Sequence, residues 1–143
     1  MKFGIVLLNV FLAVAAATAV AEVAGKYTVD VQPGEYGDYL VNETGFSLYY
    51  FVNDAPGNGT STCSGACAET WPPFYVESIA VPEGLNSSDF NTFERADGKM
   101  QVTFRGWPLY LFSGDNVAGE INGQGVRGIW FVVNPSDFPP VSI

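Results

Sequence analysis

The sequence predicts an all-β fold, a compact antiparallel β-sandwich or barrel made of two repeats and preceded by an N-terminal signal helix. One observation is an internal repeat. Another is composition, because short segments rich in Val, Tyr, Phe, Trp and Thr alternate with clusters of Gly, Pro and Asn, as in strands joined by tight turns. The third is that no convincing amphipathic helix follows residue 21, although residues 82–89 have the cap-like pattern of one helical turn.

The first 21 residues have the pattern of a secretory signal peptide. A short basic start, Met1 and Lys2, precedes an apolar run to residue 21 that ends in two overlapping Ala-x-Ala sites. We therefore expect residues 1–21 to be removed and residues 22–143 to form one domain, secreted to the outside of the cell or its surface. The alternative is a retained anchor, since the run approaches the roughly 20 residues that span a bilayer.

The repeat is the strongest feature of the chain. Residues 45–54, GFSLYYFVND, align with residues 106–115, GWPLYLFSGD, at a constant offset of 61. In both copies an extended segment comes before this motif, and a Gly/Asn-rich loop and a Trp-led apolar segment come after it. Each repeat, about 36–80 and about 97–134, is thus predicted to form a hairpin, a loop and a strand. Residues 27–31 alternate like an additional strand.

Side-chain alternation predicts how the motif strands are buried. The pairs expected to share a face are Tyr49 with Phe51, Leu48 with Tyr50, Tyr110 with Phe112, and Leu109 with Leu111. Because both faces are apolar, the motif strands are predicted to be central. The motif acids, Asp54 and Asp115, then fall at strand ends, where they can accept hydrogen bonds from turn amides.

Composition excludes several kinds of chemistry. The 143 residues include no histidine, which rules out Ser-His-Asp triads, Cys-His dyads and His-ligated zinc. With 15 acidic and six basic residues, the net charge of -9 argues against sequence-independent binding to nucleic acid or anionic lipid. No pair of acids is set apart by spacing as a hydrolase pair would be.

The two motif copies, Tyr-x-Phe-x-x-Asp at 49–54 and 110–115, resemble the secreted-repeat family of bacteria and archaea, often labelled predicted lipoproteins with a Tyr-x-(Phe/Trp/Tyr)-x-x-Asp motif. The resemblance extends over about residues 36–134. It implies export and a duplicated β unit but no activity, and the lipid-attachment cysteine of many bacterial members is missing here. The acidic composition and glycosylation sequons are similar to those of archaeal, methanogen-type members.

Cys63 and Cys67 flank a turn-prone Ser-Gly-Ala spacer. Export favours their oxidation to a disulfide that holds the loop before Trp71. The alternatives are a redox-active pair, which would need a helix N-terminus or a cationic neighbour that the sequence does not indicate, and a metal-binding pair. Three sequons, at Asn42, Asn58 and Asn86, are possible glycosylation sites in turn-like stretches.

Two further constellations leave alternatives open. Asp54, Asp115 and Glu120 lie in oxygen-rich loops and are weak calcium candidates, although turn capping is the commoner role of such acids. Trp71, Trp107 and Trp130 could form a stacking surface for sugars or cofactors, although aromatics at strand spacing are more often core residues.

From these features we expect an exported, non-enzymatic structural protein of the cell envelope, a subunit of an extracellular layer or sheath that self-associates through β-sheet edges or binds other envelope proteins. We expect no cofactor. The alternative is a secreted binding module for a metal ion, cofactor or carbohydrate. A disulfide redox protein is a third possibility.

Overall fold

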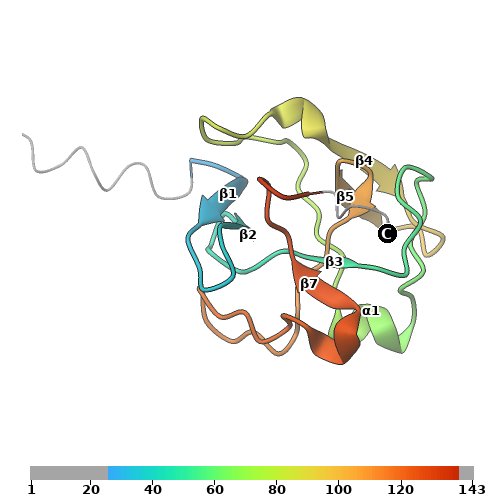
Figure 1. The fold of residues 1–143 in the computed structure, drawn as a ribbon. Helices are drawn as coiled ribbons and strands as arrows, with labels where there is room; N and C mark the ends of the chain where they lie inside the picture. The colour runs from blue at the N-terminus through green and yellow to red at the C-terminus, as the bar shows by residue number, and fades with distance from the viewer. Residues whose placement is uncertain (1–25, 139–143) are drawn as a thin grey trace, which may run out of the picture.

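The computed structural model describes residues 26–138, so the predicted signal peptide, residues 1–21, lies outside the described residues. The described part is an all-β, antiparallel fold with very little helix, as predicted (Figure 1). Its strands are β1 (Val29–Gln32), β2 (Tyr39–Asn42), β3 (Tyr49–Phe51), β4 (Phe90–Glu94), β5 (Met100–Phe104), β6 (Trp107–Pro108) and β7 (Trp130–Val132). The helical segments are α1 (Ala66–Thr70) and two 3-10 turns, η1 (Ser87–Asp89) and η2 (Val126–Gly128). Among these residues no helix is long and apolar enough to cross a membrane.

The two repeats begin with equivalent hairpins. β1 pairs with β2, and β4 pairs with β5, both antiparallel. A tight turn then leads from β2 towards β3 and from β5 to β6. Gly45 and Gly106 occupy the same position in these turns, and each has a φ of 87°, a backbone conformation that favours glycine. A Cβ atom on Gly106 would also lie only 2.9 Å from the backbone nitrogen of Gly57.

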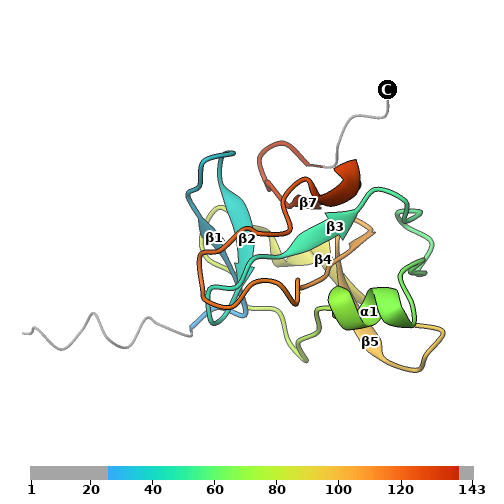
Figure 2. The same ribbon diagram turned by 90° about the horizontal axis from the view of Figure 1, so that it is seen from below.

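The third segment of each repeat pairs with the other repeat. β7, from the second repeat, pairs with β3 of the first, and Figure 2 shows the two strands side by side. Reciprocally, the Phe74 N–H of the first repeat donates to the Leu109 carbonyl at 2.9 Å. Where the halves meet, the backbone amides of Tyr49 and Tyr110 each donate to the carbonyl of the other, at 2.8 and 2.9 Å. The repeats therefore exchange equivalent contacts and are interlocked.

Two apolar clusters lie on opposite faces of the motif strands, which confirms the predicted alternation. The first cluster includes Leu48, Tyr50, Leu109 and the flanking Leu111. The second cluster includes Tyr49, Phe51, Tyr110 and the flanking Phe112. The first motif copy forms β3, as predicted, whereas in residues 109–112 of the second copy only Tyr110 makes β-bridges. β3 lies between β7 and the Tyr110 segment, so it is central, as predicted.

Two helical segments differ from the sequence-based expectation or refine it. No helix was expected near the cysteines, yet Cys67 lies in α1, a five-residue helix that ends where the Trp71 N–H donates to the Cys67 carbonyl at 2.7 Å. Five residues are too few to show a helical period in the sequence. The helical turn expected within residues 82–89 is present as η1, and the Asn86 side chain accepts a hydrogen bond from the Ser88 N–H at 3.0 Å.

Truncation of either motif leucine should destabilise the whole domain. Leu48 and Leu109 are equivalent, fully buried positions of the first cluster, so Leu48→Ala and Leu109→Ala should each lower the free energy of unfolding by about 2–5 kcal/mol in urea denaturation. Val117→Ala, at an exposed position, is the control and should change it by less than about 0.5 kcal/mol. Two separate unfolding transitions in either leucine variant would contradict the interlocked fold.

Candidate functional site

The motif tyrosine of each repeat bonds the motif aspartate of the other repeat. Tyr49 Oη donates to Asp115 Oδ2 at 2.6 Å, and Tyr110 Oη donates to Asp54 Oδ2 at 2.6 Å. All four side chains are buried. The sequence placed these acids at strand ends but gave no sign that their hydroxyl partners come from the other copy.

The second oxygen of each carboxylate caps a loop, as predicted. Asp54 Oδ1 accepts from the Thr62 N–H at 2.7 Å, and Asp115 Oδ1 accepts from the Asn122 N–H at 2.9 Å. Each aspartate thus joins its own Gly/Asn-rich loop to the tyrosine of the other repeat. These tyrosine–aspartate pairs fix where both loops begin and end.

Burial sets the protonation of these pairs. Burial in the second cluster, reinforced by Asp115, raises the pKa of Tyr49 far above its usual value near 10. Burial likewise raises the pKa of Tyr110, with Asp54 adding to the effect. Desolvation also raises the pKa of Asp115, against the opposing hydrogen bond from Tyr49. The two hydroxyls therefore stay protonated and act as donors, which suits a structural role better than proton transfer.

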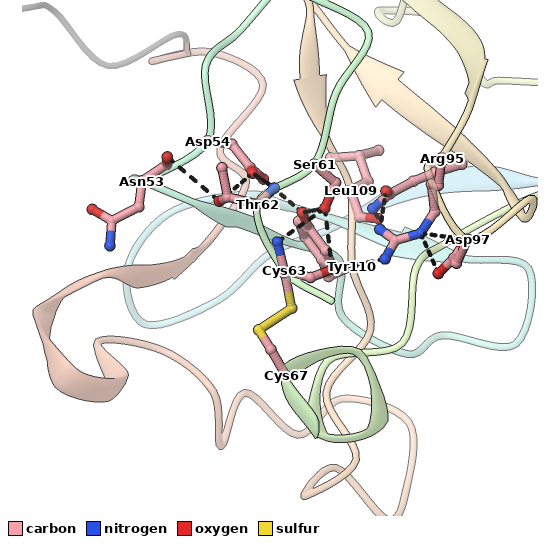
Figure 3. Close-up of a disulfide and its surroundings, with 11 residues drawn as sticks. Asn53, Asp54, Ser61, Thr62, Cys63, Cys67, Arg95, Asp97, Leu109 and Tyr110 are labelled. Carbon is pink, nitrogen blue, oxygen red and sulfur yellow. Dashed lines mark hydrogen bonds and ion pairs between the residues drawn. A yellow bond between two sulfur atoms is a disulfide. The ribbon is translucent and has the colours of Figure 1, made fainter. Parts of the chain in front are cut away.

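A buried arginine supports the cysteine loop (Figure 3). The Arg95 side chain is only 3% exposed, and its guanidinium donates to the Cys63 carbonyl at 2.7 Å and to Gln101 Oε1 at 2.8 Å. Arg95 Nε also pairs with Asp97 Oδ2 at 3.1 Å. Gln101, itself fully buried, passes the network on to the Leu109 carbonyl at 2.7 Å. Sequence reasoning missed Arg95, since a lone arginine beside a turn is usually exposed.

Cys63 and Cys67 form the predicted disulfide, with an S–S distance of 2.07 Å and a Cα–Cα distance of 5.3 Å. Cys63 is fully buried and Cys67 is partly exposed on α1. The expected absence of a helix and of a cationic neighbour is thus wrong in part, because α1 carries Cys67 and the Arg95 guanidinium contacts the Cys63 carbonyl. The bond joins the loop after Asp54 to the helix that leads to Trp71.

Four aromatic rings from both repeats form a single row, here called the aromatic stack. The Trp71 and Trp130 rings lie parallel at its centre, with centroids 3.9 Å apart and an interplanar angle of 1°. Phe112 stacks on the outer face of Trp71 and Phe51 on that of Trp130, each at 4.2 Å. Trp71 and Trp130 are thus core residues whose ring faces are covered. Trp107, in contrast, is partly buried and packs against the first cluster.

A hollow of about 540 Å³, the aromatic hollow, opens beside the aromatic stack. All four stacked rings line it, together with α1 and the η2 loop. Cys67 contributes one wall, and the exposed Arg127 of η2 lies at the edge. The lining of the hollow is mainly apolar.

Of the other predicted site residues, Glu120 lies near Asp115, since both carboxylates accept hydrogen bonds from Asn122, whereas the three sequon asparagines lie elsewhere. Glu120 accepts from the Val117 N–H at 3.0 Å, and among residues 26–138 no three His, Cys, Asp or Glu side chains converge as metal ligands would. Asn58 and Asn86 are exposed, whereas Asn42 is partly buried and accepts from the Phe46 N–H at 2.9 Å.

The two repeat units correspond to a known protein family. The family described as "Secreted repeat of unknown function" matches residues 31–75 and 91–134. The chain belongs to this family. In this secreted-repeat protein the two matched segments are the two interlocked units, and the extracellular localisation expected from the signal peptide agrees with the family description. No curated protein and no solved structure matches the chain significantly.

Removing a motif hydroxyl should weaken the fold. Tyr49→Phe and Tyr110→Phe each delete a buried hydrogen bond to a carboxylate, so each should lower the free energy of unfolding by about 1.5–3 kcal/mol in urea denaturation. Tyr36→Phe is the matched control, because the Tyr36 side chain is 59% exposed and its substitution should cost less than about 0.5 kcal/mol. Motif variants as stable as the control would contradict a structural role for the pairs.

The same pairs predict a loss of stability at high pH. Because the pKa values of Tyr49 and Tyr110 are raised in the folded state, the unfolded chain releases these protons above about pH 10 while the folded chain retains them. The free energy of unfolding should therefore fall as the pH rises above this value. In urea denaturation measured over this pH range, the free energy of unfolding should fall less steeply with pH for the Tyr49→Phe/Tyr110→Phe double variant than for the wild type. An equal slope for the two proteins would contradict this prediction.

Proposed function

We propose that the protein is an exported, non-enzymatic structural protein of the cell envelope, a subunit of an extracellular layer or sheath whose copies associate through β-sheet edges. The observation that carries this proposal is the open outer edge of β4. The family description supports export. The cell-surface location, the archaeal, methanogen-type origin and glycosylation, for which Asn58 and Asn86 are accessible, are parts of the proposal.

β4 is an edge strand of the sheet ordered β4-β5-β6. The hydrogen bonds that continue its ladder, Arg95 N–H to the Lys99 carbonyl and Arg105 N–H to the Asp89 carbonyl, show that the odd-numbered residues face β5. The backbone groups of Thr92 and Glu94 therefore point outward. Among residues 26–138 no strand or loop pairs with them, which leaves a template for another strand.

The equivalent edge of the first repeat is closed. The Thr28 and Val29 amides both donate to the Ala80 carbonyl, at 2.8 and 3.3 Å. The Val31 N–H, which corresponds to that of Thr92, donates to its neighbour Asp30 Oδ1 at 2.8 Å. The two repeats thus differ at their edge strands, because the outward backbone groups of β4 remain free to pair with another strand and those of β1 do not.

Charge also permits β4 to pair with itself. In an antiparallel pairing of two copies centred on Thr92, Glu94 of each copy lies opposite the apolar Phe90 of the other, so no acids face one another. Such a contact is two-fold and closes into a dimer. A layer or sheath then requires a second contact, with further copies or with other envelope proteins.

The motif supports the non-enzymatic part of the proposal. Its tyrosines and aspartates are buried and bonded to one another and to loop amides, and the aromatic hollow contains none of them. The polar side chains of the repeated motif therefore hold the two units together.

The second candidate is a secreted binding module, which the aromatic hollow favours. Carbohydrate stacking on Trp71 or Trp130 is disfavoured, because both ring faces are covered. The metal-binding version lacks a cluster of ligands in the described part of the chain. For the redox protein, the third possibility, thiol exchange would have to start at Cys67, since Cys63 is fully buried.

The test uses a proline at the outward-facing position of β4. Thr92→Pro removes an outward N–H without deleting a bond to β5, so it should block edge pairing and leave the fold intact. Thr92→Val is the matched control because it keeps the N–H. Sedimentation velocity over rising concentrations should show association for the wild type and for Thr92→Val, and loss of the β4-paired dimer for Thr92→Pro.

Circular dichroism should be the same for all three proteins, and electron microscopy of purified protein and of cell envelopes should show ordered assemblies for the wild type. A wild type that stays monomeric at high concentration, or a Thr92→Pro variant that associates equally well, would overturn the proposal.

A further inference from the structure

We propose that the aromatic hollow binds a small planar aromatic anion, such as an aromatic carboxylate. This inference rests on the second candidate, the binding module, and does not depend on self-association through β4. Two features of the hollow carry it: a floor made of aromatic ring edges and a cation beside that floor.

The floor selects for flat ligands. The faces of Trp71 are covered by Trp130 and Phe112, and those of Trp130 by Trp71 and Phe51. Both tryptophans line the hollow, so they can present only their ring edges to it. Ring edges carry the positive part of the aromatic quadrupole and attract the negative face of another π system in T-shaped geometry. A planar aromatic ring lying flat across the row of edges satisfies this preference.

The edge of the hollow selects for negative charge. Of the three arginines, Arg95 pairs with Asp97 and Arg105 pairs with Asp89. Arg127, exposed at the hollow, forms no ion pair with any acid of residues 26–138, although the whole chain carries 15 acids and six basic residues. Its guanidinium is therefore available to a carboxylate on a ligand.

The loop that carries Arg127 is fixed to the aromatic stack. Gly125 N–H donates to the Trp130 carbonyl at 2.8 Å, and Gly128 N–H donates to the Gly125 carbonyl at 3.0 Å. Arg127 itself has a φ of 55°, a left-handed conformation that is unfavourable for a side chain of this size. The arginine is thus held beside the ring edges by the same backbone that positions Trp130.

The size of the hollow suits a ligand of one or two fused rings. Its volume of about 540 Å³ lies within the roughly 300–1,000 Å³ of small-molecule sites. Cys67, a partly exposed residue on the α1 wall, adds a polarizable disulfide sulfur, and sulfur contacts aromatic rings favourably.

The test compares three naphthalene probes that share one ring system: naphthoate, the uncharged naphthylmethanol and the cationic naphthylmethylammonium. Isothermal titration calorimetry with the exported protein should show naphthoate binding about tenfold more tightly than naphthylmethanol and naphthylmethylammonium binding most weakly. Cyclohexanecarboxylate, an anion without a flat π face, should bind at least about tenfold more weakly than naphthoate.

Three variants locate the site. Arg127→Gln should weaken naphthoate binding about tenfold and leave naphthylmethanol binding unchanged. Lys99→Gln removes a positive charge at an exposed position that does not line the hollow and should change neither. Ala66→Trp places a ring in the hollow from an exposed position of α1 and should abolish binding of all the naphthalene probes while the circular dichroism spectrum is retained.

Undetectable naphthoate binding, equal affinity for naphthoate and naphthylmethanol, or full binding by Ala66→Trp would overturn the inference. The same titrations on Thr92→Pro separate it from the proposed assembly. That variant should bind naphthoate as the wild type does, so a failure of self-association and a failure of ligand binding are distinguishable.

Discussion

The structure depends on the two reciprocal hydrogen bonds between a tyrosine of one repeat and an aspartate of the other. One oxygen of each carboxylate accepts a hydrogen bond from a buried hydroxyl, and the other accepts one from a loop amide. Each aspartate therefore joins the central strands to a loop residue seven or eight positions further along the chain. Because the acid and its hydroxyl donor belong to different copies, neither repeat can satisfy its buried polar groups alone. Burying an aspartate without such donors would be costly.

The aromatic stack and the disulfide loop pack around the two tyrosine–aspartate pairs. The tyrosine rings meet Trp71 and Trp130 edge-on, at centroid distances of 5.4 and 5.1 Å, and the tryptophans stack between the two repeats. The disulfide and the Arg95 network then hold the loop of the first repeat. The second repeat has no equivalent disulfide, and its loop ends at η2. The aromatic hollow lies between α1 and η2.

The sequence was sufficient for features that depend on local periodicity. The offset between the repeats, the two faces of the motif strands and the placement of Asp54 and Asp115 at strand ends all follow from neighbouring residues, as does the disulfide across a short spacer. The exchange of hydroxyl donors between copies could not be predicted, because nothing in the repeated motif indicates whether Tyr49 bonds the aspartate of its own copy or that of the other copy. Burial of Arg95 was missed because it depends on the Cys63 carbonyl, 32 residues away in the chain. The helix α1 was missed because one helical turn shows no period in the sequence.

The interlocked arrangement makes the fold equivalent to an isologous dimer contained in one chain. Each repeat offers the same tyrosine, aspartate and third segment that it receives, so the surface between them is self-complementary. The segment from Tyr75 to Asp89 acts as the tether that makes this association intramolecular and sets the effective concentration of one repeat for the other. A single repeat without the tether would have to find a second molecule to complete its core, and its stability would then depend on protein concentration.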